Sequence, residues 1–240
     1  MNAGRTKPRP ALPRWLWLWF PPLLLLLILP VRALSPELYA QWIDGELGLI
    51  ELATPVFALL GAGIGFGLSL QLTQPDKRVL RTWVVIMTVA CVYFAGEEIS
   101  WGQHLFGWGT PEAIDRLNDQ HETNLHNMSS WFDQKPRLLL ELWVLVGGIF
   151  VACGRGAELL VDPARPGTWF WPTVDCLPTA VLAIGIRMPE RFKTVLDLEA
   201  LSFDLRWSEP QEYYFALFLM LYLASLKARL RAASEGPSRD

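Results

Sequence analysis

Charged residues are scarce in this chain: they make up 19% of its 240 residues, while 52% are hydrophobic and the mean hydropathy is +0.25. So few charges argue against an ordinary soluble domain, and a net charge of -3 indicates no nucleic-acid partner. Cysteine is scarce too. The three cysteines form no CxxC motif, which argues against a disulfide framework or a thiolate metal site. The glycine-rich phosphate loops and the Gly-x-Ser-x-Gly motif are also missing.

Long apolar runs are what the chain does have. A membrane-spanning helix needs about 20 mostly apolar residues, and helices satisfy every backbone polar group inside lipid. The predicted spans are approximately 15–31, 49–72, 79–101, 137–155, 168–186 and 212–230. We therefore predict an all-α fold over residues 1–240: one polytopic transmembrane helix bundle of about six helices, five being the alternative count. An interfacial outer loop at 102–136 would join the third and fourth helices.

Basic residues are distributed unevenly between the two sides of the predicted bundle. With a cytoplasmic N-terminus, 13 of the 21 Lys and Arg residues lie on the cytoplasmic side. We therefore predict an integral protein of a bacterial cytoplasmic (inner) membrane with both termini cytoplasmic. The first run follows a basic leader, so a cleaved signal peptide remains an alternative for that segment.

The second predicted span contains two interleaved GxxxG patterns, formed by Gly61 with Gly65 and by Gly63 with Gly67. Glycines four residues apart form a flat strip on a helix, which lets another helix approach closely. The pattern indicates either packing within the bundle or a helix-mediated oligomer.

A dense polar cluster occupies residues 96–127. It contains an adjacent carboxylate pair, Glu97 and Glu98, and all three histidines of the chain: His104, His121 and His126. Carboxylates at a membrane boundary are costly unless protons, cations or metal neutralise them. On a continuing helix Glu97, Trp101 and His104 share one face, and Glu122 and His126 are spaced to bind one ion.

A second acidic patch, Glu209 and Glu212, enters the membrane from the same predicted side. We predict one site from the two patches, because carboxylates and His from several helices recur in bundle metal centres. The candidate catalytic residues are Glu97, Glu98 and His121. The candidate ligands of a divalent metal, zinc or similar, are Glu98, His104, Glu122, His126 and Glu212. The alternative is structural, with these side chains capping helices and Glu97 and Glu98 pairing with Arg116, Arg137 or Arg206.

Two further acids, Glu51 and Asp175, lie inside apolar runs. An intramembrane acid is either a functional group or a hydrogen-bonded contact of the bundle. The sequence leaves both interpretations open.

The strings GEEISWGQ (96–103) and ETNLHN (122–127) resemble a pattern of uncharacterised polytopic bacterial membrane proteins. The resemblance covers about the central third of the chain and implies no known activity. The glutamic CAAX-processing proteases also place two adjacent glutamates and later histidines at membrane depth. Glu97 and Glu98 match those glutamates, but Gly102 stands where that motif has Arg, so only the mechanism is analogous.

Together these features predict an outward-facing site near the lipid headgroups, where Trp101, Trp108 and Trp131 favour the interface. Our hypothesis is a hydrolase or transferase, metal-dependent or acid–base, that acts on a membrane lipid or a lipid-linked substrate. The alternative is a non-enzymatic accessory or transport protein whose Glu/His cluster binds an ion or is structural.

Overall fold

The computed structural model describes residues 10–43, 48–112, 123, 130–153, 166–196 and 207–235. Every regular element in these residues is a helix, as predicted. Five helices are long and apolar enough to cross a membrane: Trp15–Leu34, Leu49–Gln71, Pro75–Glu98, Thr168–Val195 and Ser208–Glu235. The chain is therefore an all-α bundle with the properties of a membrane protein.

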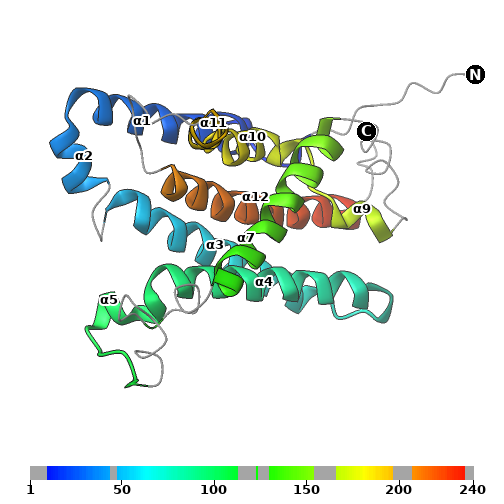
Figure 1. Ribbon diagram of the computed structural model, residues 1–240. Helices are drawn as coiled ribbons and strands as arrows, with labels where there is room; N and C mark the ends of the chain where they lie inside the picture. Colours follow the sequence, from blue (N-terminus) through cyan, green and yellow to red (C-terminus); the bar gives the residue numbers. More distant parts are fainter. Residues whose placement is uncertain are drawn as a thin grey trace, which may run out of the picture.

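The first half of the bundle runs back and forth (Figure 1). The π-helical turn η1 (Trp15–Trp19) leads into α1 (Phe20–Leu34), and the short α2 (Pro36–Trp42) follows. Helix α3 (Leu49–Gln71) returns, and α4 (Arg78–Glu98) comes back after the 3-10 turn η2 (Pro75–Lys77). The turn η3 (Ser100–Gly102) and α5 (Gln103–Phe106) then begin the outer loop.

The second half is less regular. Helix α7 (Ser130–Trp143) continues as a π-helix, η5 (Val144–Val151). Helix α9 (Pro166–Phe170), the turn η6 (Val174–Cys176), α10 (Leu177–Gly185) and α11 (Met188–Val195) follow, and α12 (Ser208–Glu235) ends the described chain. Pro172 follows Trp171 where α9 ends, and the residue before a proline disfavours helical geometry.

The fourth predicted span, 137–155, is helical in its described part but is not among the five long apolar helices. It runs obliquely to its neighbours (Figure 1). Its first turns carry Arg137 and Glu141, and both form ion pairs with other helices. A helix that places two charges in ion pairs near one end has less apolar length left to cross lipid.

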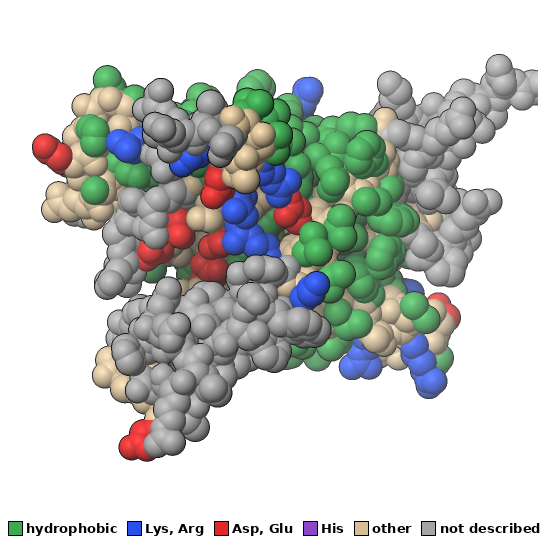
Figure 2. Space-filling view, in the orientation of Figure 1, with side chains coloured by type: hydrophobic (Ala, Val, Ile, Leu, Met, Phe, Trp, Pro, Cys, Tyr) green, Lys and Arg blue, Asp and Glu red, His purple; other side chains and the backbone are tan. Residues whose placement is uncertain are grey.

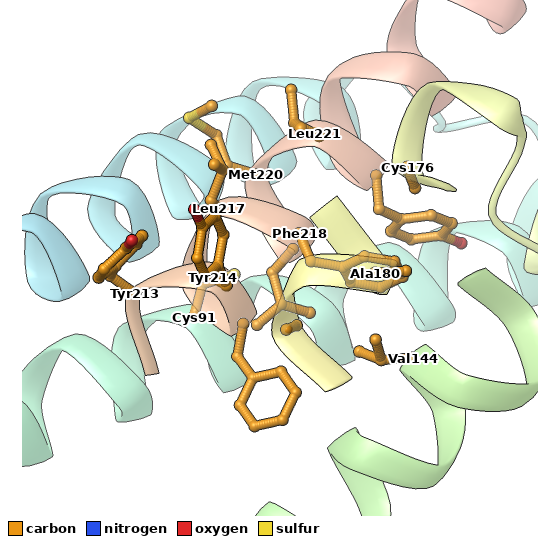
Figure 3. Packing of buried hydrophobic residues seen from close by; sticks show 14 of the residues in the cluster. Cys91, Val144, Cys176, Ala180, Tyr213, Tyr214, Leu217, Phe218, Met220 and Leu221 are labelled. Atoms are coloured by element: carbon orange, nitrogen blue, oxygen red, sulfur yellow. The ribbon is translucent and has the colours of Figure 1, made fainter. Parts of the chain in front are cut away.

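Helix α12 is the centre of the bundle. From Tyr213 to Leu223 each of its residues is at most 7% exposed. Figure 3 shows Phe218 of α12 beside Ala180 of α10, and both belong to the same buried cluster as Leu217 and Leu221 of α12 and Val144 of η5. A helix that is buried on every side belongs in the interior, and α12 accordingly lies between α1 and α10 on one side and α3 and α4 on the other (Figure 1).

Glycines set how closely these helices pack. A Cβ on Gly61 or Gly65 would meet α4 and α12, whereas a Cβ on Gly63 or Gly67 would meet nothing within 4 Å. One GxxxG pair therefore serves packing inside the bundle, and the other lies on an open face of α3. A Cβ on Gly148 would come within 2.7 Å of Ala180, so η5 crosses α10 at this glycine.

The first described residues lie beside the second half of α12, because Leu12 and Ser225 both bond Asp175. We call this end of the bundle the inner end; α12 ends there, on the right of Figure 1. Buried Asp175 there accepts hydrogen bonds from the backbone N–H groups of Ala11 (3.0 Å) and Leu12 (3.3 Å). The hydroxyls of Thr173 and Ser225 donate to its Oδ2 at 2.9 and 2.8 Å. This intramembrane acid is thus a hydrogen-bonded bundle contact, one of the two interpretations that the sequence left open.

Candidate functional site

The outer end of α4 is closed by an unusual backbone turn. The predicted third span is approximately 79–101, and helix α4 ends at Glu98. Ser100 (φ 46°), Trp101 (φ 54°) and Gly102 (φ 93°) follow in left-handed conformations. A non-glycine residue in this region costs about 1–2 kcal/mol, so contacts elsewhere must stabilise the turn.

The side chain of Trp101 supplies such contacts. Its indole N–H donates a 2.7 Å hydrogen bond to Oε1 of Glu97, which is only 4% exposed. The ring lies over Gly96, where a Cβ would come within 2.9 Å of it, and packs edge-on against Tyr93. Glu97 and Trp101 therefore meet as predicted, although a turn and not a continuing helix brings them together.

Gln103 connects distant parts of the outer loop. Its side-chain amide donates to the hydroxyl of Thr110 (3.0 Å) and accepts a hydrogen bond from the backbone N–H of Thr123 (2.6 Å). One side chain thus joins points 7 and 20 residues away along the chain. The described parts of the loop are tied back toward the end of α4.

Glu98 lies in an acidic cluster contributed by three helices. This half-buried side chain interacts electrostatically with Glu212 and Glu209 of α12, with Glu51 of α3, and with Arg137 of α7. Within the described part of the chain its carboxyl makes no hydrogen bond or ion pair. The structure thus brings together Glu98 and Glu212, two of the predicted site residues, together with the neighbouring Glu209.

Arg137 and Gln211 fix the position of this cluster. The guanidinium of Arg137 forms a salt bridge with Glu212 (2.9 Å) and donates to Oε1 of Gln211 (2.9 Å). Arg187 donates to the same Gln211 oxygen at 3.4 Å. Gln211 is completely buried, and its amide nitrogen donates to the backbone carbonyl of Ala183 (3.0 Å). One neutral side chain therefore holds two guanidinium groups beside each other.

Further ion pairs surround these groups. Arg187 pairs with Glu190 (2.9 Å), and Arg191 of α11 pairs with Glu141 of α7. Figure 2 shows the basic and acidic side chains gathered near α11 and the start of α12, beside a hydrophobic surface. On the visible face this group lies toward the outer end of the bundle, and a second group of mostly basic side chains lies at the lower right.

A cavity of about 540 Å³ opens next to this charged region, between α4, α7 and α12. Ligand pockets usually measure about 300–1,000 Å³. Aromatic side chains form much of its wall: Trp83, Tyr93, Phe94, Trp143 and Phe215. Arg137 and Glu212 also line it and are its only charged lining residues in the described part of the chain. The cavity is therefore apolar along its length and polar at the ion pair.

The histidine side chains of the predicted site lie in parts of the molecule that the structure does not describe. His121, Glu122 and His126 lie outside the described residues, as does the side chain of His104. Among the residues that are described, no group of three or more His, Cys, Asp or Glu could hold a metal ion. The described carboxylates alone do not fit a metal centre, and the predicted metal site remains a prediction.

Sequence reasoning missed the roles of Gln211 and Arg187. The structural alternative named Arg116, Arg137 or Arg206 as partners of Glu97 and Glu98, but the salt bridge of Arg137 is to Glu212. A signal for Gln211 was available: it is a polar residue one position before Glu212, at the start of an apolar helix. Nothing in the sequence shows that two arginines from separate segments meet at its oxygen.

Comparisons with known proteins give no further guidance. No family model, curated protein or solved structure matches the chain. The function must therefore be argued from the geometry of this site.

Proposed function

We propose that this chain is a membrane-embedded enzyme that acts on a lipid or lipid-linked substrate by hydrolysis or transfer. One observation carries the proposal: the 540 Å³ apolar cavity is lined by the Arg137–Glu212 ion pair, and the carboxyl of Glu98 interacts electrostatically with both residues and is unpaired among the described residues. An apolar pocket with a few convergent polar groups is the usual form of a ligand site. Here the pocket suits a hydrocarbon chain, and the charged end suits a head group.

Glu98 is the proposed acid–base group. A general base must be able to reach the proton that it removes, and its carboxyl is free of other hydrogen-bond partners in the described residues. Glu97 has a different role, because the Trp101 indole and burial hold it in place. We assign Glu97 to positioning the turn beside Glu98. His121, with His104, Glu122 and His126, would carry protons or bind a divalent metal such as zinc, and no step of this proposal depends on that metal.

The proposal places the site at the outer leaflet of a bacterial inner membrane, with both termini cytoplasmic. The bias of basic residues supports this orientation. The fold is compatible with it, because Leu12, before η1, and Ser225, in the second half of α12, both lie at Asp175 at the inner end of the bundle. The substrate would then enter the cavity from the lipid phase between α4 and α7.

Conversion of lipids by the purified protein tests this proposal. The protein is incubated with a total membrane lipid extract, and mass spectrometry follows which lipids are consumed and formed. Wild type should convert at least one lipid class, and Glu98→Gln should reduce the rate by about 10²–10⁴-fold. Glu235→Gln, at an exposed position near the end of α12, is the matched control and should leave the rate unchanged.

Adjacent residues of α4 supply a second control. Ala90 lines the cavity, whereas Val89 is 62% exposed on the helix surface. Ala90→Trp should fill the cavity and abolish conversion, and Val89→Trp should not. Full activity of Glu98→Gln would exclude it as the acid–base group. If wild type converts no lipid, the enzymatic proposal is wrong and the accessory-protein alternative takes its place.

The metal expectation has its own measurement. Elemental analysis of the purified protein should find a divalent metal near one equivalent, and His126→Ala and Glu98→Gln should lose it. If wild-type protein converts lipid without bound metal, the metal is removed from the proposal. Acid–base catalysis by Glu98 then remains as the mechanism.

A further inference from the structure

We infer that the ligand of the α4–α7–α12 cavity is a lipid with a phosphate in its head group. The inference rests on the proposed function and adds the chemical class of the substrate. It is based on three features of the cavity: the guanidinium groups near it, the acids that pair with them, and the hydrogen-bond donors that have no partner among the described residues.

The first observation is the pair of guanidinium groups. Arg137 and Arg187 both lie within hydrogen-bond distance of one oxygen of Gln211. The side chains of Arg137 and Arg187 are 24% and 26% exposed, so neither is sealed inside the protein. Arginine presents planar sets of N–H donors that match the oxygens of a phosphate. Arg137 lines the apolar cavity, and Arg187 lies beside it at the shared Gln211 oxygen, so the two groups together fit a lipid phosphate.

The second observation is that the cavity wall has buried donors without acceptors. Within the described residues, Nε of Arg137 and the indole nitrogen of Trp143 have no hydrogen-bond partner. Both residues line the cavity. A buried donor without a partner costs about 1–3 kcal/mol, so a ligand that supplies acceptors gains affinity there. Phosphate and ester oxygens are acceptors, whereas a hydrocarbon or an amine head group would leave both donors unused.

The charge balance determines how the phosphate binds. Glu212 already pairs with Arg137, and Glu190 with Arg187. Binding therefore relies on directed N–H donors and on burial more than on excess positive charge. The location of Glu98 near Arg137 and Glu212 places its carboxyl at the head group and away from the chain.

The test compares two lipids with identical chains, dioleoyl phosphatidate and dioleoylglycerol, bound to purified protein in a neutral detergent. Native mass spectrometry gives the affinities. Phosphatidate should bind at least about tenfold more tightly, and Arg187→Gln should remove most of that difference. Trp143→Phe, which keeps a ring in the cavity but removes the donor, should weaken phosphatidate binding severalfold. Arg81→Gln, an exposed position near the start of α4, should change neither affinity.

The possible results separate this inference from the proposed function. Equal binding of the two lipids, with both blocked by Ala90→Trp, would refute the phosphate and leave the lipid cavity standing. Failure of both lipids to bind would count against both proposals. Tight phosphatidate binding that survives Arg187→Gln, Trp143→Phe and Ala90→Trp would place the phosphate elsewhere and refute the inference. Displacement of phosphatidate by millimolar inorganic phosphate would show a free-anion site and would also refute it.

Discussion

Replacing Asp175 should unfold the protein at a markedly lower temperature. Asp175 is fully buried and accepts four hydrogen bonds: one at Oδ1, from Leu12, and three at Oδ2, from Ala11, Thr173 and Ser225. It also interacts electrostatically with Arg229. Asp175→Ala removes the acceptor of every one of these bonds and the electrostatic interaction with Arg229.

The expected magnitude follows from these contacts. A buried donor left without its acceptor costs about 1–3 kcal/mol, and four donors lose the same carboxyl, so we expect a loss of at least about 4 kcal/mol. For a chain of this size, 1 kcal/mol shifts the midpoint of thermal unfolding by about 2–4 °C. We therefore expect Asp175→Ala to lower the midpoint by about 10 °C.

Asp175→Asn should fall between wild type and Asp175→Ala. Its amide oxygen can replace Oδ2 and keep three of the four bonds, while its NH₂ group would face the N–H of Leu12. Asp76→Ala is the control, since Asp76 is exposed in the turn before α4. The order of stability should be wild type and Asp76→Ala, then Asp175→Asn, then Asp175→Ala.

Intrinsic tryptophan fluorescence during heating in detergent measures these midpoints, and the twelve tryptophans give a strong signal. A midpoint for Asp175→Ala within about 2 °C of wild type would refute the energetic reasoning. Loss of lipid conversion by Asp175→Asn at unchanged stability would refute the structural role itself, because it would make Asp175 a functional group.

Four further outcomes are expected. Gly148→Ala should lower stability by about 1–3 kcal/mol in the same thermal assay, because its Cβ would overlap Ala180, whereas Gly63→Ala meets open space and should not. Trp101→Phe should cost about 1 kcal/mol by removing the hydrogen bond to Glu97, and an unchanged midpoint would show that this bond does not hold the turn. Reporter fusions after residue 120 should report an outward location, and a cytoplasmic signal would overturn the orientation. The intact mass of the membrane-extracted protein should retain the first helix, and a mass without it would support the cleaved-signal alternative.

The helices were predictable because hydrocarbon imposes a simple requirement on sequence. A span must be apolar over about 20 residues, and α3, α4 and α12 meet that requirement within a few residues of the predicted limits. The prediction was weakest where the apolar run is interrupted. Pro172 divides the fifth span into α9 and α10, and the fourth span begins with charged residues that form ion pairs.

The candidate site was only partly predictable. Buried acids are costly in a membrane, and this cost alone linked Glu98 with the acids at the start of α12. The left-handed turn at Ser100 and Trp101 could not be foreseen, because neither residue type favours that conformation and only tertiary contacts stabilise it. The pairing of Arg137 with Glu212 depends on how α7 crosses the bundle, which no local pattern encodes.

The polar groups around Asp175 and those around Glu98 differ in how completely their hydrogen bonds are satisfied. At the inner end, the carboxyl of Asp175 has a donor for each of its oxygens and is sealed from solvent. At the outer end, Glu98 makes no hydrogen bond or ion pair with the described residues, and the cavity beside it has donors without acceptors. A membrane protein gains no stability from leaving polar groups unsatisfied, because each one carries a desolvation cost. Nε of Arg229 at the inner end also lacks a partner within the described residues, so an unsatisfied donor alone does not mark a site. The outer donors differ because Arg137 and Trp143 line the large cavity. We therefore propose binding and chemistry at the outer end and fold stabilisation at the inner end.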